Sequence, residues 1–430
     1  MTRRTFGTLD GAALVVSTVV GAGIFTIPSY VAQLAGSAVA VLALWLAGGL
    51  MALAGALCYA ELAARMPRGG AEYTYLREAF GPTAGFLSGW TSFIAGFSGA
   101  IAAAAVGFAR HLADVAPALA GREVGIALLL IGAFTAISIA GVGASRVATN
   151  LLTGLIIVGV AAMTVAGLTG TPVTAAPSEP SGASVGILSA LVPIFFTYSG
   201  WNAAAYVAGE FRDPERTVPR ALIAGTLVVT LLYVGLNAAL LRSLATAGVA
   251  ASATPVSDSA AVVIGAAGAG AVTTLVLAAL ASSVCAMVIT GPRIYMEMSR
   301  DGVLPRFFGR VGERGVPVAA ALAQSSWSAI LVMSGTFEQI VTYTGFAIVV
   351  FSGLAVLSLF VLRRRLGVPR TFRVPGYPVL PALFVACVAL IAVASFRYAP
   401  GPSLAGLALI GAGIPLSRMW SRSRSTTQPA

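Results

Sequence analysis

The sequence predicts an all-α polytopic membrane protein with twelve transmembrane helices, and three observations carry this prediction. First, 58% of the 430 residues are hydrophobic and only 10% are charged, whereas a soluble domain carries about 25% charged residues. Second, long stretches without Asp, Glu or Arg recur along the chain. Third, the arginines gather between these stretches in an uneven pattern. A soluble enzyme cannot build its surface from so few charges, and the mean hydropathy of +0.91 agrees.

The charge-free stretches give the number of spans, because a helix needs about 20 apolar residues to cross the hydrocarbon core. Residues 11–60 are long enough for two spans with a turn near Gly36 and Ser37, and we interpret the first as an uncleaved span. Ten further stretches hold one span each: 79–109, 124–145, 147–178, 180–209, 221–241, 259–292, 315–337, 339–362, 374–396 and 398–417.

The basic residues support this count and set the expected orientation. All 26 are arginine. Twelve spans place both termini on one side, which then collects 22 arginines, while the other side holds only Arg110, Arg122, Arg242 and Arg397. Because positive residues concentrate in cytoplasmic loops, we expect a multi-pass protein of the cell membrane with both termini cytoplasmic. The net charge of +11 therefore indicates no nucleic-acid partner, since no single basic face collects the arginines.

Few residues offer catalytic or metal chemistry. Cys58, Cys285 and Cys387 lie inside apolar runs and resemble small buried hydrophobes, and the one histidine, His111, lies in a predicted loop. We therefore expect no enzyme and no cofactor other than an ion. A channel would need a continuous polar pore or charged rings, and a receptor would need an output domain, so both alternatives are disfavoured.

Two spans contain helix-breaking residues at mid-membrane. Span 1 reads VVGAGIFTIP over 19–28, and span 6 reads PIFFTYSGWN over 193–202. Unwound backbone is tolerated there only where it is buried or lines a cavity. Breaks at matching positions, five spans apart, indicate an inverted-repeat transporter with a midplane site. The alternative is that these glycines and prolines only permit close helix packing.

The breaks suggest what such a site binds. Half-helices starting after Gly23 and after Gly200 would present free N–H groups and a positive dipole end, which suit a carboxylate. The carbonyls that end the preceding half-helices, such as those of Val19 and Phe196, would suit an ammonium group. A zwitterionic amino acid carries both groups.

Several motifs resemble those of the amino acid–polyamine–organocation superfamily, and of its L-type amino acid transporters in particular. They are VGAGIF at 20–25, YAEL at 59–62 with PRGGAEYTY at 67–75, FFTYSGWN at 195–202 with EFRDPERTVPR at 210–220, and PRIY at 292–295 with RDGVLP at 300–305. The resemblance implies a leucine-transporter-type fold with a 5+5 inverted repeat. Spans 1–5 would occupy 1–170, spans 6–10 would occupy 180–362, spans 11 and 12 would occupy 374–417, and 418–430 would form a polar cytoplasmic tail.

The resemblance also implies a substrate site. Its predicted residues are Val19, Ala22, Gly23, Ile24, Phe196, Thr197, Ser199, Trp201 and Asn202. The amides of Ala22 and Gly23 would hold the carboxylate, although relatives often have Ser in place of Ala22. Carbonyls of Val19, Phe196 and Ser199 would hold the amine, and the Phe196 ring would occlude the site. Trp201 and Asn202 are as well explained by local packing and capping.

The coupling ion stays open between alternatives. Many relatives have a Lys in span 5, where Ile156 stands here, and this chain has no Lys at all. A possible sodium site, matched by resemblance, comprises Ser17, Val20, Ala279, Ser282 and Ser283; alternatively, these serines only join helices. Glu61, Glu210 and Glu297 are expected to pair with arginines near helix ends rather than to relay protons.

These observations predict secondary-active transport of a neutral amino acid. The parts of spans 3 and 10 expected to line the pocket, around 90–98 and 342–346, contain no acid or base to pair with a charged side chain. Sodium coupling, uncoupled exchange and export all remain alternatives, and the sequence does not determine whether an accessory subunit binds.

Overall fold

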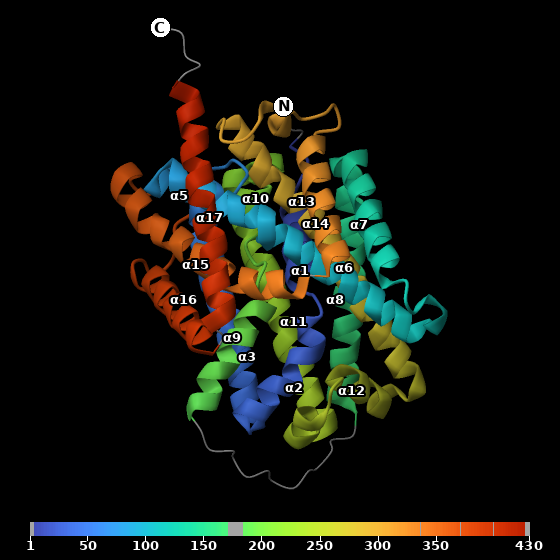
Figure 1. Cartoon of the computed structure of the whole chain (residues 1–430). Coiled ribbons are helices and arrows are strands. Elements are labelled where there is room, and N and C mark those ends of the chain that lie inside the picture. The colour runs from blue at the N-terminus through green and yellow to red at the C-terminus, as the bar shows by residue number, and fades with distance from the viewer. Residues whose placement is uncertain (1–3, 171–183, 336, 370, 399, 426–430) are drawn as a thin grey trace.

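The computed structural model describes residues 4–170, 184–335, 337–369, 371–398 and 400–425, and this part of the chain is helical (Figure 1). Nine of its helices are long and apolar enough to cross a membrane. They are α3 (Ala38–Arg65), α5 (Pro82–Thr91) continued by α6 (Phe97–Val115), α7 (Glu123–Ala140), α8 (Val142–Thr169), α11 (Pro214–Ala251), α13 (Ala266–Arg300), α15 (Phe337–Leu366), α16 (Val379–Tyr398) and α17 (Pro400–Ser425).

A tenth span comes from two helices joined at a bend. Helix α1 (Thr8–Val19) and helix α2 (Gly23–Ala35) together meet the same criteria, and their axes differ by 54°. Two further apolar helices are shorter, α9 (Ser184–Thr197) and α14 (Val318–Ser334). Helix α4 (Glu72–Phe80), helix α10 (Ala203–Tyr206) and helix α12 (Pro255–Ile264) are too short to span.

The predicted turn between the first two spans is confirmed. Helix α2 ends at Ala35, and Gly36 takes the left-handed conformation with φ +69°. Ser37 then caps α3 by accepting a hydrogen bond from the Ala40 amide at 3.3 Å. Glycine is suited to this position because a side chain strains a left-handed backbone.

Some predicted boundaries differ from the structure, because a stretch without charges does not mark where a helix bends. The stretch 259–292 contains the end of α12, a turn at Gly265 with φ +77° and most of α13. Arg146, which was expected to separate two spans, lies inside α8. Helix α17 continues to Ser425, past the predicted start of a tail at 418. The proposed division between the repeats, at 170–180, lies largely outside the described residues.

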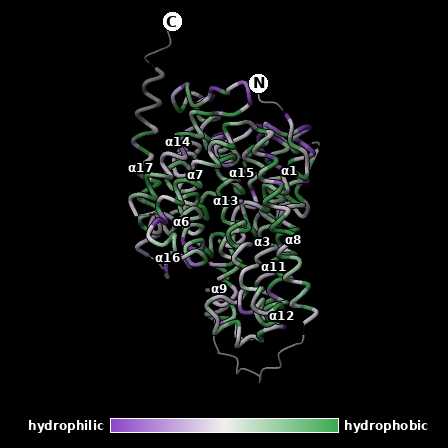
Figure 2. The backbone as a smooth tube through the Cα atoms, turned by 90° about the vertical axis from the view of Figure 1, so that its right-hand side faces the viewer, coloured by the Kyte–Doolittle hydropathy of each residue, from purple (hydrophilic) through white to green (hydrophobic). Residues whose placement is uncertain are grey.

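The centre of the bundle is formed by helices that carry the breaks and by those packed on them. Helix α11 packs against α1, α3 and α8, while α13 packs against α6 and α8. Both chain ends lie at one end of the bundle, which we call the termini end, and α12 lies at the opposite end (Figure 1). Hydrophilic segments concentrate toward the termini end (Figure 2).

The start of the chain is fastened to the segment that follows α10. Phe6 forms an isolated β-bridge with Phe211, and their rings meet edge to face at 5.6 Å. The Phe6 amide donates to the Glu210 carbonyl at 3.0 Å, and the Arg212 amide donates to the Phe6 carbonyl at 3.0 Å. This contact ties the start of the described chain to the segment that follows the second break.

Candidate functional site

The first break separates α1 from α2 over three residues. The Val20 amide makes the last hydrogen bond of α1, to the Val16 carbonyl at 2.8 Å, and Val20 itself is extended. Helix α2 restarts at Gly23. A Cβ at Gly23 would lie 3.1 Å from the Thr197 hydroxyl oxygen. The two broken segments therefore approach each other closely at this glycine.

The second break covers residues 198–202. Gly200 has φ +109°, and a Cβ there would lie 3.0 Å from the Thr18 carbonyl oxygen. A helix, α10, restarts after Gly200 as predicted, but it is short and its first amide is not free. The Ala203 amide already donates to the Gly200 carbonyl at 3.0 Å, and α10 has only four residues. The positive end of a regular half-helix is therefore supplied by α2 alone.

One hydroxyl, from Tyr233 of α11, joins the two breaks. It lies 3.0 Å from the Val19 carbonyl oxygen and 3.2 Å from the Thr197 carbonyl oxygen. The Phe196 carbonyl, which was expected to suit an ammonium group, accepts the Ser199 amide at 3.0 Å. Each of these oxygens keeps a second lone pair for a ligand. The sequence did not single out Tyr233, because a lone tyrosine in an unbroken span gives no signal.

A cavity of about 630 Å³ lies against both breaks. Eight of the nine predicted substrate-binding residues line it: Val19, Ala22, Gly23, Phe196, Thr197, Ser199, Trp201 and Asn202. The ninth, Ile24, does not line the cavity and is fully buried in the hydrophobic core. Its side chain points away because successive residues of a helix face different directions.

The opposite wall comes from α5, α6 and α15. The part of span 3 expected to line the pocket does so at Thr91, Ser92, Gly96 and Phe97. Between α5 and α6 the chain forms a π-helical turn over Ser92–Gly96, and such turns are frequent at functional sites. Of the predicted span 10 residues, the side chains at 342–344 and 346 lie outside the described set. Helix α15 meets the cavity from Ala347 onward.

Trp201 and Asn202 line the cavity and also pack locally. The Trp201 ring meets Tyr59 edge to face at 4.8 Å and Phe384 at 5.8 Å. The Asn202 amide nitrogen donates to Oε1 of Glu72 at 2.6 Å and to the Tyr206 hydroxyl at 3.1 Å. Both residues therefore have the structural partners that the alternative interpretation expected.

Glu72, the first residue of α4, also lines the cavity, although its side chain is buried. Its Oε1 accepts from the Tyr59 hydroxyl at 2.7 Å as well as from Asn202. Burial raises the pKa of the Glu72 carboxyl, and hydrogen bonds from Tyr206, Tyr59 and Asn202 partly oppose that rise. Sequence reasoning missed Glu72 because α4 lies outside the spans, where an acidic residue is ordinary.

The predicted cation residues form a tight hydroxyl cluster. Ser17 Oγ lies 2.7 Å from Ser282 Oγ and 2.5 Å from Thr153 Oγ1, a residue that the prediction did not include. The Ser283 hydroxyl donates toward the Ser17 carbonyl at 3.2 Å and the Val20 carbonyl at 3.4 Å.

The two remaining positions near this cluster carry no polar side chain. Ala279 is buried on α13, and Ile156 is buried on α8. The serines of this cluster therefore join helices by hydrogen bonds, which is what we expected if they do not form a sodium site.

Three buried glutamates at the termini end pair with arginines, as the sequence predicted. Arg293 Nε donates to Glu210 at 2.7 Å, and both side chains are only 2% exposed. Arg363 pairs with Glu61, which also accepts from the Val374 amide at 2.7 Å.

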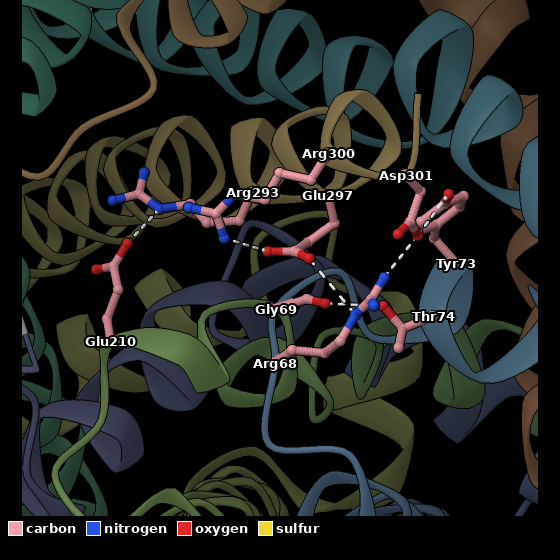
Figure 3. A network of polar contacts seen from close by, with 9 residues as sticks. All are labelled: Arg68, Gly69, Tyr73, Thr74, Glu210, Arg293, Glu297, Arg300 and Asp301. Carbon is pink, nitrogen blue, oxygen red and sulfur yellow. Dashed lines mark hydrogen bonds and ion pairs between the residues drawn. The ribbon is translucent and has the colours of Figure 1, made fainter. Parts of the chain in front are cut away.

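The third glutamate, Glu297, belongs to a network that ties α13 to the α3–α4 connection (Figure 3). It pairs with Arg300 at 2.7 Å and with Arg68 at 3.4 Å. Arg68 also pairs with Asp301 at 2.6 Å, and the Tyr73 hydroxyl donates to the same carboxylate at 3.0 Å. These contacts link α13 to α4 and to the α3–α4 connection at the termini end.

Comparisons with known proteins identify the family of this chain. Residues 6–414 match the family described as Amino acid permease. Over 391 residues, or 89% of each protein, the chain is 28% identical to the Serine/threonine exchanger SteT of Bacillus subtilis. It is 26% identical over 433 residues to the Large neutral amino acids transporter small subunit 2 of Homo sapiens, or 96% of this chain and 80% of that protein. It is 28% identical over 413 residues to the b(0,+)-type amino acid transporter 1 of Mus musculus, or 92% of this chain and 84% of that protein.

Proposed function

Because this chain belongs to the amino acid permease family, we propose that it moves neutral L-amino acids across the cell membrane by alternating access. Family membership makes it a multi-pass membrane transporter of amino acids, within the amino acid–polyamine–organocation superfamily, and not an enzyme. The observation that carries the finer proposal is the pair of broken helices facing one cavity of about 630 Å³.

The architecture we propose has twelve spans in a 5+5 inverted repeat plus two. The bent pair α1 and α2 would be span 1, and α9 with α10 would be span 6. Helix α14 would be the ninth span despite its 17 residues. This count places the termini on the arginine-rich side, which supports cytoplasmic termini.

The substrate contacts we propose use main-chain atoms. The amides of Ala22 and Gly23, at the start of α2, would hold the carboxylate. Carbonyls of Val19, Phe196 and Ser199 would hold the ammonium group. The half-buried Phe196 ring lies beside Gly345, where a Cβ would come within 3.0 Å of it, and would cover the bound molecule.

The chemistry of the lining supports a neutral side chain. Among the described residues that line the cavity there is no arginine, and the one acidic group, Glu72, already accepts hydrogen bonds from the protein. Thr91 lines the cavity, and its buried hydroxyl has no hydrogen-bond partner among the described residues, so a polar substrate side chain could supply one. The names of the relatives above, a serine/threonine exchanger and a large neutral amino acids transporter, are consistent with this class.

For coupling, we favour exchange without sodium. The hydroxyls of Ser17, Ser282 and Thr153 satisfy one another, so an ion would have to replace these bonds. Sodium symport is the second candidate, because the Ser283 hydroxyl and the carbonyls of Ser17 and Val20 lie close together.

Proteoliposome uptake of labelled amino acids tests these proposals. Vesicles preloaded with unlabelled L-serine or L-leucine should accumulate the labelled neutral amino acid faster than empty vesicles, with no effect of a sodium gradient. L-Arginine and L-glutamate should not enter. A requirement for sodium would establish symport instead, and saturable entry of arginine or glutamate would overturn the neutral class. Conductance without saturation would indicate a channel.

The variant Gly23→Leu tests the main-chain site itself. Its side chain would press on Thr197, where the added Cβ alone lies at 3.1–3.2 Å, and would occupy the space between the breaks. Overpacking of about 1–3 kcal/mol corresponds to a loss of exchange of about five-fold to a hundred-fold. Gly154→Leu is the matched control, because a Cβ there meets nothing within 4 Å. Equal exchange by both variants would contradict the proposed site.

A further inference from the structure

Glu72 is the one buried glutamate at the cavity that is held by neutral groups alone. In the part of the chain that the structure describes, its partners are the hydroxyls of Tyr59 and Tyr206 and the amide of Asn202. An ionised carboxylate buried without a cation loses its hydration and gains only hydrogen bonds in return. Such a group exchanges a proton more readily than one locked in an ion pair.

The elements around α4 bring no charge to this carboxyl. Helix α3 presents Tyr59, α10 presents Tyr206, and α4 itself adds Tyr75, whose ring meets that of Tyr59 at 5.6 Å. Helices α5, α13 and α15 also pack against α4. Helix α5 contains no charged residue, the α13 carboxylate Glu297 pairs with arginines, and Arg365 of α15 donates to the Glu78 carbonyl.

The same carboxyl joins three segments, two of which line the cavity. Tyr59 belongs to α3, Glu72 begins α4, and Asn202 ends the second break. The Gly70 amide adds a backbone link to the Tyr206 carbonyl at 3.0 Å. Trp201, next to Asn202, lines the cavity and packs on the ring of Tyr59. The Tyr59 hydroxyl donates to the Glu72 carboxyl, so Tyr59 links this carboxyl to the aromatic lining of the cavity.

We propose that Glu72 is a proton-binding site that couples the substrate cavity to pH. As a carboxylate it accepts from Tyr59, Asn202 and Tyr206 and holds the second break against α3 and α4. A proton from water in the cavity converts it to a neutral carboxylic acid, which is a weaker acceptor, so these three bonds loosen. Loosening frees the second break to move against α3 and α4 during the transport cycle. This inference rests on the proposed transport function.

The direction of the pH effect follows from the environment of the group. Burial raises the pKa of Glu72 above its ordinary value of 4.5. The carboxyl therefore takes up its proton at a higher pH than an exposed glutamate does. Exchange should accelerate as pH falls through that pKa, and it should level off once Glu72 is protonated.

Infrared titration of the purified protein tests the site without any substrate. A carbonyl band of a protonated carboxylic acid should appear as pH falls, at a pH above that of exposed carboxyls. Glu72→Gln should remove the band, and Glu78→Gln should keep it, because Glu78 is exposed on the same helix. A band of unchanged intensity in Glu72→Gln, or no such band in the unaltered protein, would overturn the proposal.

Exchange of labelled L-serine and L-leucine in proteoliposomes tests the coupling. Glu72→Gln should exchange at a rate independent of pH, whereas Glu72→Asp and Glu78→Gln should keep the dependence. Tyr59→Phe removes a bond to the carboxylate form, so its pH profile should shift to higher pH. An unshifted profile in Tyr59→Phe, or an unchanged one in Glu72→Gln, would contradict the proposal. If the unaltered protein exchanged no neutral amino acid, the transport function would fail, and the infrared result would still decide whether Glu72 binds the proton.

Discussion

Glu210 and Glu72 are both buried near the termini end, yet their surroundings differ. Glu210 is 2% exposed and accepts from the guanidinium of Arg293, which is equally buried and also donates to the Ile289 carbonyl at 2.6 Å. Glu72 accepts from a phenol and a carboxamide and faces a cavity. The first glutamate belongs to a fixed ion pair, and the second has an environment in which its charge can change.

The termini end therefore contains two kinds of buried glutamate, those in ion pairs with arginines and Glu72, which has neutral partners. Ion pairs with arginines tie Glu61, Glu210 and Glu297 to segments that are distant in sequence. The carboxyl closest to the break lacks that restraint. Three substitutions at this end test the difference between Glu72 and the ion-paired glutamates.

The largest effect is expected from Arg293→Met. It leaves the buried Glu210 carboxylate without its cation, which should destabilise the protein by about 3–5 kcal/mol. Thermal unfolding in detergent measures the loss. Adding Glu210→Gln to Arg293→Met should recover much of it, because no buried charge then remains unpaired. If the double variant were less stable than Arg293→Met alone, an unpaired Glu210 charge would not explain the loss, and the prediction would be wrong.

A smaller effect on stability is expected from Glu72→Gln. Glutamine keeps an acceptor oxygen for Tyr59 and Asn202 and removes a buried charge, so the change should cost about 1 kcal/mol or less. The same unfolding assay applies, with Glu78→Gln as the exposed control. A loss as large as that of Arg293→Met would show that the Glu72 carboxylate is also a fixed structural charge.

The smallest effect is expected from Arg68→Ala. Arg68 pairs with Glu297 and Asp301, but its side chain is 43% exposed, and Arg77 and Arg300 remain beside those carboxylates. Such pairs contribute about 0–1 kcal/mol. The change should be largest in low salt, because solvent ions screen exposed charges. A salt-independent loss of several kcal/mol would instead show that the pairs of Arg68 stabilise the protein as much as the buried ion pairs do.

Composition and local sequence were sufficient for the class of protein and for the two breaks. A chain with 58% hydrophobic and 10% charged residues can fold only with its surface in lipid. Glycines and prolines weaken a helix wherever they occur, so the breaks at 20–22 and 198–202 follow from local chemistry. The pairing of Glu61, Glu210 and Glu297 with arginines also followed from their places near helix ends.

Tertiary packing alone decided which distant groups meet at these breaks. Tyr233 reaches both broken ends, Thr153 completes the hydroxyl cluster of Ser17, and Glu72 enters the cavity from a short helix outside the spans. Ile24 is excluded from the cavity by the direction of its side chain on α2. The physical reason is that helix periodicity fixes which face a residue occupies, whereas the neighbour of that face depends on how separate helices pack.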